Sequence, residues 1–245
     1  GLGDVYKRQD EYWNIDALLH PQGEKGEFTA RLAATADGKK LTVTDKQQAD
    51  AVLAALDGKD YTITKIEKGK RRRQPAPPFI TSTLQQDASR RFGFQAKRTM
   101  KVAQELYEGI NLPDLGAVGL ITYMRTDSLR ISDEALSAAH DYIQRTYGEN
   151  YALAKPRTFR SKSNAQDGHE AIRPTMIDLA PAKIKESLSS DQYKLYKLVW
   201  ERFIASQMAA CVQDTVSTDI TAGEHLFKAC LLYTSDAADD LIGVD

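Results

Sequence analysis

Cysteine is scarce in this chain of 245 residues, and its two cysteines, Cys211 and Cys230, form neither a disulfide framework nor a metal site by themselves. The chain also lacks a run of about 18 apolar residues, so we expect no transmembrane helix. Its N-terminus has neither the charged nor the apolar region of a signal peptide. These absences indicate a reducing, cytoplasmic setting.

Neither sign of charge dominates the composition. The 33 lysines and arginines and the 34 acidic residues leave a net charge of -1, which gives no overall signal for nucleic acid. Basic residues nevertheless gather over residues 65–73 and again over 90–101. Each cluster is able to meet DNA phosphates, but a solvated linker and a solvated helix face would look the same.

The hydrophobic periodicity changes twice along the chain. Alternation typical of strands dominates the first part, a basic and proline-rich stretch at 69–78 interrupts it, and helical spacing follows. Alternation returns at about residue 212. A helical part between two strand-rich parts predicts an α+β fold in which a helical domain is inserted into a β domain.

The elements expected from these patterns have approximate bounds. Strands are expected over residues 11–19, 28–34, 40–43, 61–66, 120–124 and 212–221, and from residue 226. Helices are expected over residues 45–56, 82–92, 96–108, 132–147 and 191–208, and from Pro181. Asp45 with Gln48, Ser82 with Gln85, and Ser132 are the expected capping residues at three of the helix starts.

Tyr123 lies two residues before Arg125 in the stretch Gly-Leu-Ile-Thr-Tyr-Met-Arg-Thr-Asp-Ser, residues 119–128. A tyrosine hydroxyl with a pKa of ~10 is a poor nucleophile, but a nearby guanidinium can stabilise phenolate charge or bind a phosphate. Attack of such a hydroxyl on a phosphodiester gives a covalent phosphoenzyme. Tyr-x-Arg is also a common sequence, and an ordinary buried strand ending in a polar turn is the alternative reading.

Three stretches together resemble the type IA DNA topoisomerases. They are Pro-Phe-Ile-Thr-Ser-Thr-Leu-Gln-Gln at residues 78–86, the tyrosine stretch at 119–128, and Gly-His-Glu-Ala-Ile-Arg-Pro-Thr at 168–175. The resemblance covers about residues 10–229. It favours bacterial topoisomerase I over a topoisomerase III-like enzyme or a reverse gyrase.

The resemblance implies a domain organisation. Residues 10–76 would be the first part of a β-rich arch domain, and residues 210–229 its return strands. Residues 77–209 would be the inserted, mostly helical domain that bears the tyrosine, with its return helix.

The resemblance also implies roles for individual residues. Tyr123 would be the nucleophile that attacks one DNA strand and keeps the 5′-phosphate, with Arg125 stabilising the transition-state charge. His169 and Arg173 match the family's phosphate contacts, whereas Glu170 reads as their structural partner. Further candidates for DNA contact are Ser82, Thr83, Gln85 and Arg98. Simple capping is the alternative for the first three, because short polar side chains serve both purposes at a helix start.

The activity implied is relaxation of negative supercoils without ATP, by breaking one strand, passing a strand and resealing. The partner would be a single-stranded segment of supercoiled DNA, and the enzyme a cytoplasmic, nucleoid-associated monomer. The family uses Mg²⁺ held by a Glu and an Asp-x-Asp pattern in a separate domain, and no Asp-x-Asp occurs here. We therefore expect a fragment that holds no metal and is inactive alone. A catalytically silent DNA-binding module is the alternative from another class.

The two ends of the chain read as foreign. Residues 5–9 and 230–234 can be encoded by the two strands of one inverted DNA repeat, as in translated transposon-end adapters. We therefore expect residues 1–9 and 230–245 to be non-native ends that pack poorly.

Overall fold

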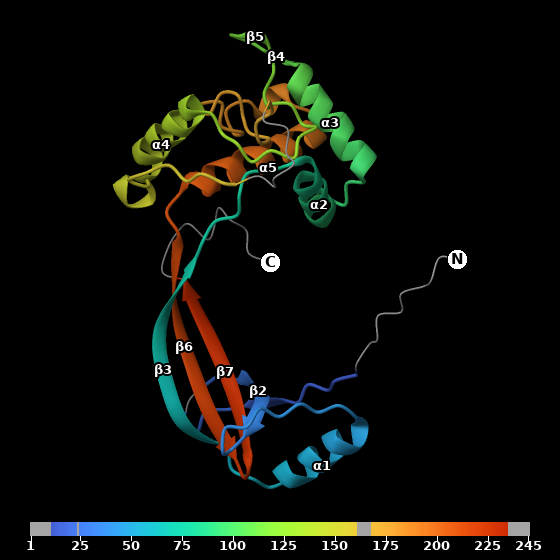
Figure 1. The fold of residues 1–245 in the computed structure, drawn as a ribbon, viewed down its shortest axis with the longest axis vertical. Helices are drawn as coiled ribbons and strands as arrows, with labels where there is room; N and C mark the ends of the chain where they lie inside the picture. Colours follow the sequence, from blue (N-terminus) through green and yellow to red (C-terminus); the bar gives the residue numbers. More distant parts are fainter. Residues whose placement is uncertain (1–10, 24, 161–167, 235–245) are drawn as a thin grey trace, which may run out of the picture. The chain divides into compact units, whose positions relative to one another are not determined.

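The computed structural model describes residues 11–23, 25–160 and 168–234, and its contacts divide them into two compact units. The described residues up to Arg72 and from Val212 onward form the first, which we call the sheet unit. Arg73–Cys211 form the second, the helical unit. Figure 1 shows strands prevailing in the one and helices in the other, which confirms the α+β class. The divisions predicted from the sequence lie at 76/77 and 209/210.

The sheet unit is built on five strands in the order β1-β2-β7-β6-β3, and β1–β2, β2–β7 and β6–β7 are antiparallel pairs. The strands are β1 Asp16–Leu19, β2 Phe28–Thr35, β3 Thr62–Arg73, β6 Cys211–Ala222 and β7 His225–Thr234. Phe227 is fully buried in its small core, and the Tyr61 ring meets it edge-on at 5.4 Å between centroids. Residues 40–43, expected as a strand, form only isolated bridges to Ala34 and Trp13.

Helix α1, Lys46–Leu56, begins as the sequence predicts. The Asp45 carboxylate accepts a hydrogen bond from the Gln48 N–H at 2.8 Å, and the Gln48 side chain accepts one from the Thr44 N–H at 3.1 Å. These bonds satisfy amide groups that have no partner within the helix, so the capping prediction is confirmed.

Strand β3 is longer than expected, because it runs through the basic stretch that we interpreted as the beginning of a linker. All of its residues are exposed, and it lies at the edge of the sheet next to β6. An edge strand is held by backbone pairing and needs no apolar period, so periodicity alone could not find it.

The described residues of the helical unit form four α-helices and a small hairpin. Figure 1 shows α2, α3 and α4 gathered around α5. The elements are α2 Thr81–Phe92, α3 Ala96–Glu108, β4 Ile110–Leu112, β5 Gly116–Val118, α4 Asp133–Tyr147, the 3-10 turns η1 Glu149–Tyr151 and η2 Lys185–Ser187, and α5 Ser190–Gln207.

Helix α5 supplies the centre of the core of this unit. Leu195, Val199 and Phe203 are buried on it at helical spacing. The Tyr196 hydroxyl donates to the Leu179 carbonyl at 2.7 Å, and the Trp200 indole N–H donates to the Ile177 carbonyl at 3.0 Å. Burial raises the pKa of Tyr196, so its hydroxyl stays protonated and acts as a structural donor.

Three local expectations in this unit are wrong. Residues 120–124 do not form a strand, because their backbone groups bond to different partners on two sides. No helix begins at Pro181, where turns lead into η2. The N-cap of α2 is Ile80 rather than Ser82, and the Thr83 hydroxyl accepts from the Ile80 N–H at 3.0 Å.

The expected foreign ends lie mostly outside the described residues, which include nothing of 1–9 or 235–245. The backbone of residues 230–234 continues β7 opposite β6, from the pair Ser217↔Cys230 to the pair Gln213↔Thr234. Within the described part of the chain, no helix has the length and apolar character needed to cross a membrane.

Candidate active site

Tyr123 lies in an irregular loop of the helical unit, where its side chain is 37% exposed. Two rings flank it. The Tyr107 ring of α3 meets it edge-on at 5.5 Å between centroids, and the His169 ring lies tilted at 5.4 Å. The exposed fraction excludes a tyrosine buried in the core.

The loop is anchored on both sides of Tyr123. Ile121 and Met124 are buried in the core. The Leu120 N–H donates to the Leu106 carbonyl at 2.7 Å. The Thr122 N–H donates to the Arg173 carbonyl at 2.9 Å, and its hydroxyl donates to the carbonyl of Ala171 at 2.7 Å. The tyrosine is therefore presented by a backbone tied both to α3 and to the segment that carries His169.

The hydroxyl of Thr81, the first residue of α2, holds the backbone on either side of Arg125. It accepts from the Thr126 N–H at 2.9 Å and lies 2.8 Å from the Met124 carbonyl oxygen, to which it can donate. The Thr81 N–H donates to the Thr126 carbonyl at 3.0 Å. These bonds attach the Arg125 backbone to the N-terminal end of α2.

Arg125 is exposed, and among the described residues no hydrogen bond or ion pair engages its guanidinium or the neighbouring carboxylate of Asp127. The alternative in which Arg125 pairs with Asp127 is therefore not adopted. Arg125, Asp127 and His169 line a hollow of about 430 Å³ together with Ile80, Thr81 and Ser82 at the start of α2. The guanidinium and the helix N-terminus favour an anion in this hollow, whereas the Asp127 carboxylate opposes one.

Helix α2 is fixed to α5 by a buried ion pair. The Asp87 carboxylate is 5% exposed and accepts from Arg202 of α5 and from Arg90. Arg202 also lies over the Phe79 ring at 4.4 Å from its centroid. Desolvation lowers the pKa of Arg202. This contact holds the start of α2, and with it Thr81, against the core.

Arg173, predicted as a phosphate contact, has a different environment from Arg125. Its Nε and Nη2 donate to one Glu170 oxygen at 3.0 and 2.6 Å, and Nη1 donates to the Pro174 carbonyl at 3.0 Å. The two side chains are 14% and 16% exposed. The pair holds the segment around His169 in place, which agrees with the structural role expected for Glu170.

Of the remaining candidates, Arg98 and Thr83 form hydrogen bonds within the chain, whereas Ser82 and Gln85 line hollows. Arg98 makes two hydrogen bonds to Asp191, at 2.8 and 2.9 Å, and covers the Phe94 ring at 4.4 Å. Thr83 caps α2. Ser82 lines the hollow beside Arg125, and both Ser82 and Gln85 line a second hollow along α2.

Sequence reasoning missed two residues of the site. Tyr107 has the helical spacing of a core residue on α3, yet it is 41% exposed beside Tyr123. Thr81 lies among polar residues at a helix start, so nothing in the local pattern distinguishes it. Among the described residues, no three His, Cys, Asp or Glu side chains converge in a way that could hold a metal ion, so they do not fit a magnesium site.

An exposed tyrosine thus lies beside His169, which lines the same hollow as the unpaired guanidinium of Arg125. A family model described as DNA topoisomerase matches residues 6–236, nearly the whole chain. The full-length topoisomerase I of Thermotoga maritima is similar in structure, with a TM-score of 0.73 and 30% sequence identity over 98% of this chain. The chain belongs to the bacterial type IA DNA topoisomerases. It spans 37% of the length of the Thermotoga maritima enzyme.

Proposed function

We propose that the enzyme containing this chain breaks one DNA strand through Tyr123. The phenolic oxygen attacks the phosphorus of a phosphodiester and loses its proton. The bond from phosphorus to the 3′ oxygen breaks, that oxygen takes up a proton, and the 5′-phosphate stays on the tyrosine. A DNA strand passes through the break. The 3′ hydroxyl then attacks the phosphotyrosine and reseals the strand.

The observation that supports this proposal most strongly is the placement of Arg125. Its guanidinium has no partner among the described residues, and it follows the exposed Tyr123 by two residues. Thr81 holds the backbone on either side of Arg125, and a cation placed next to the attacked phosphate stabilises charge that develops in the transition state. His169 lines the same hollow, and its ring centroid lies 5.4 Å from that of Tyr123, so we assign it to phosphate contact.

The proposal extends to the setting of the reaction. The phosphotyrosine ester conserves the energy of the broken bond, so no ATP is required. The substrate is a single-stranded segment of negatively supercoiled DNA, and the enzyme acts as a monomer in the cytoplasm, at the nucleoid. The described residues fit no magnesium site. Magnesium therefore enters only as a component of the complete enzyme, and none of these steps is assigned to it.

A graft tests the proposal. Residues 10–229 replace the corresponding segment of Thermotoga maritima topoisomerase I, and the graft is incubated with a labelled single-stranded oligonucleotide. A denaturing gel should show protein-linked DNA, and Tyr123→Phe should abolish it without changing DNA binding. Tyr107→Phe is the matched control and should retain the adduct. An adduct that persists in Tyr123→Phe would assign the nucleophile to another residue.

We expect the chain alone to leave a supercoiled plasmid unrelaxed at equimolar concentration, with or without magnesium. Arg125 and His169 supply only part of the charge stabilisation that the reaction requires. An agarose gel reports the outcome. A topoisomer ladder produced by this chain and absent in Tyr123→Phe would show that the catalytic machinery is complete here.

A further inference from the structure

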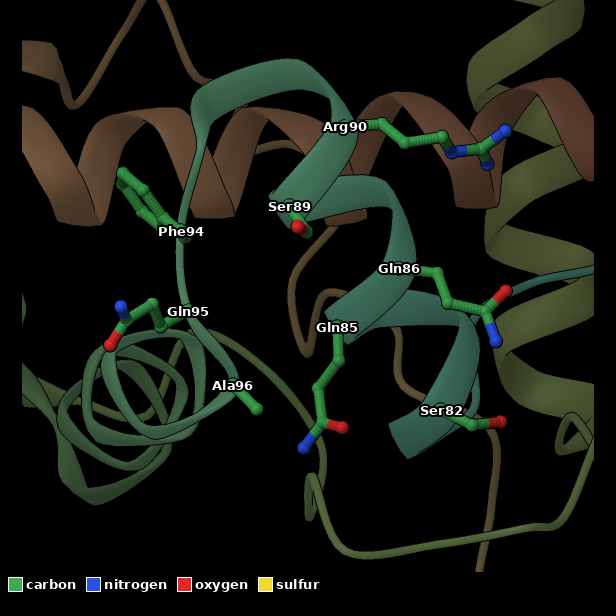
Figure 2. Close-up of a pocket in the computed structure, with 8 residues that line it drawn as sticks. All are labelled: Ser82, Gln85, Gln86, Ser89, Arg90, Phe94, Gln95 and Ala96. Carbon is green, nitrogen blue, oxygen red and sulfur yellow. The ribbon is translucent and has the colours of Figure 1, made fainter.

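A second hollow lies along α2 next to the candidate active site. It has a volume of about 600 Å³, and Ser82 lines both hollows. Figure 2 shows Gln85 extending from α2 and Gln95 from the connection to α3, with Ala96 between them. The second hollow therefore continues the first along the face of α2.

The local fold creates this hollow. Helix α2 ends at Gly93 in the left-handed conformation, with a φ of 66°, so that the chain turns into α3. Phe94, at 2% exposure, fixes the turn in the core. Gln95 and Ala96 then stand opposite Gln85, and glycine is needed at 93 because other residues rarely adopt that φ.

The glutamines of this hollow differ from the others of the helical unit. Its remaining described glutamines all form side-chain hydrogen bonds within the chain, namely Gln74, Gln104, Gln144, Gln192 and Gln207. Gln85, Gln86 and Gln95 have no such bond to any described residue, and all three line the hollow. Ser82 and Ser89 share both properties. Figure 2 shows Gln85 and Gln95 on the side of Ala96, whereas the side chains of Gln86 and Ser82 extend away from Gln95. The unpartnered amides of Gln85 and Gln95 therefore flank one part of the hollow.

The chemistry of the lining indicates the ligand. Each glutamine amide offers both a donor and an acceptor, which matches the edge of a nucleobase and allows two parallel bonds to one base. A phosphate would instead be met by cations. The one arginine of the lining, Arg90, is paired with Asp87. The hollow therefore suits a base better than a backbone phosphate.

We propose that this hollow binds an unpaired base of the DNA strand whose phosphate lies beside Tyr123. Gln85 and Gln95 bind the base edge, and Ser82 lies at the junction with the phosphate hollow. The Watson–Crick edge of a base is free only in a single strand, so the hollow selects single-stranded DNA at the cleavage point. This inference rests on the proposed function and deepens it by placing the base next to the attacked phosphate.

The test follows the side-chain amide signals of the chain by NMR during titration with a single-stranded DNA dodecamer. A second dodecamer has the same backbone but abasic positions in its centre. The amides of Gln85 and Gln95 should shift with the first strand and not with the second. The double variant Gln85→Ala/Gln95→Ala should bind the intact strand about tenfold more weakly and the abasic strand within about twofold of wild type. The matched control is Gln104→Ala/Gln144→Ala, whose glutamines lie outside the hollow, and it should bind as wild type.

Three outcomes would overturn the inference. They are unchanged Gln85 and Gln95 signals at millimolar oligonucleotide, an equal loss of affinity for both strands, and an equal loss in the control variant. The graft distinguishes a failure of the base-site inference from a failure of the proposed function. If the graft forms the Tyr123 adduct and the double variant binds the intact strand as tightly as wild type, the base site is refuted and the proposed function stands. Base-dependent binding without any Tyr123 adduct would overturn the proposed function, and with it the place of the base beside an attacked phosphate.

Discussion

The Thr81 hydroxyl accepts a hydrogen bond from the Thr126 N–H at 2.9 Å, which attaches the first residue of α2 to the backbone just after Arg125. Thr126 is itself buried, and water cannot readily replace this bond. The position of Arg125 therefore depends on a residue from another part of the chain, which carries no obvious catalytic chemistry.

Replacing Thr81 with valine keeps the side-chain shape and removes the hydroxyl. The buried Thr126 N–H then loses its acceptor, at a cost of about 1–3 kcal/mol. We expect the Thr126 amide to exchange its hydrogen at least tenfold faster in Thr81→Val, while Thr81→Ser exchanges nearly as wild type. Hydrogen exchange followed by NMR measures both. Equal protection in the valine variant would show that the bond does not hold this loop.

Removal of the Arg173 side chain should lower the stability of the helical unit, whereas removal of the Arg125 side chain should lower the rate of adduct formation. Arg173→Ala leaves the half-buried Glu170 without its main partner, and we expect the helical unit to lose about 3 kcal/mol of stability. Arg125→Ala removes an exposed side chain without a partner and should change stability by less than about 0.5 kcal/mol. In the graft, however, it should slow adduct formation about a hundredfold.

The measurement of stability uses Trp200 fluorescence during urea unfolding, in a Trp13→Phe background so that only the helical unit is reported. An Arg173→Ala variant as stable as wild type would refute the structural role assigned to the Arg173–Glu170 pair. An Arg125→Ala graft with the wild-type rate would refute the catalytic part given to Arg125.

Gly119 packs against the α3 backbone too closely for any side chain. A Cβ at this position would lie 2.6 Å from the Tyr107 carbonyl oxygen, so the backbone must shift. We expect Gly119→Ala to cost about 1–3 kcal/mol and to displace the tyrosine loop. Gly168→Ala is the matched control, because a Cβ there meets nothing within 4 Å. Urea unfolding compares the two, and an equal effect would contradict the close approach.

Glu201 on α5 gives a prediction with a pH dependence. Desolvation raises its pKa in the folded state, although Lys197 at 3.6 Å opposes the shift. A raised pKa means that its contribution to stability is complete below the unfolded value of about 4.5 and is lost as pH rises through the folded value. Glu201→Gln should therefore match wild type near pH 4 and exceed its stability at pH 7. Thermal unfolding at both pH values checks this, and a variant less stable at pH 7 would show that the ion pair with Lys197 outweighs desolvation.

The sequence alone determined the class of fold and several helix starts. Asp45 and Ser132 cap α1 and α4 as predicted, because capping depends on residues only a few positions apart. The buried face of α5 follows in the same way from helical spacing. The tyrosine motif identified the family, which the comparisons confirm.

Only the tertiary structure decided how the site is assembled. Residues 120–124 have the apolar run of a strand, but their N–H groups donate to Leu106 and Arg173, so no strand forms. Arg125 and Arg173 are equivalent as residue types. Arg173 is tied to the distant Thr122 and Ser132 as well as to its neighbour Glu170, whereas the Arg125 guanidinium has no partner among the described residues. Tyr107 has core spacing on α3, yet the loop of Tyr123 leaves it exposed. The physical reason is range, since capping and periodicity act within a few residues, whereas these partners are brought together by the packing of distant segments.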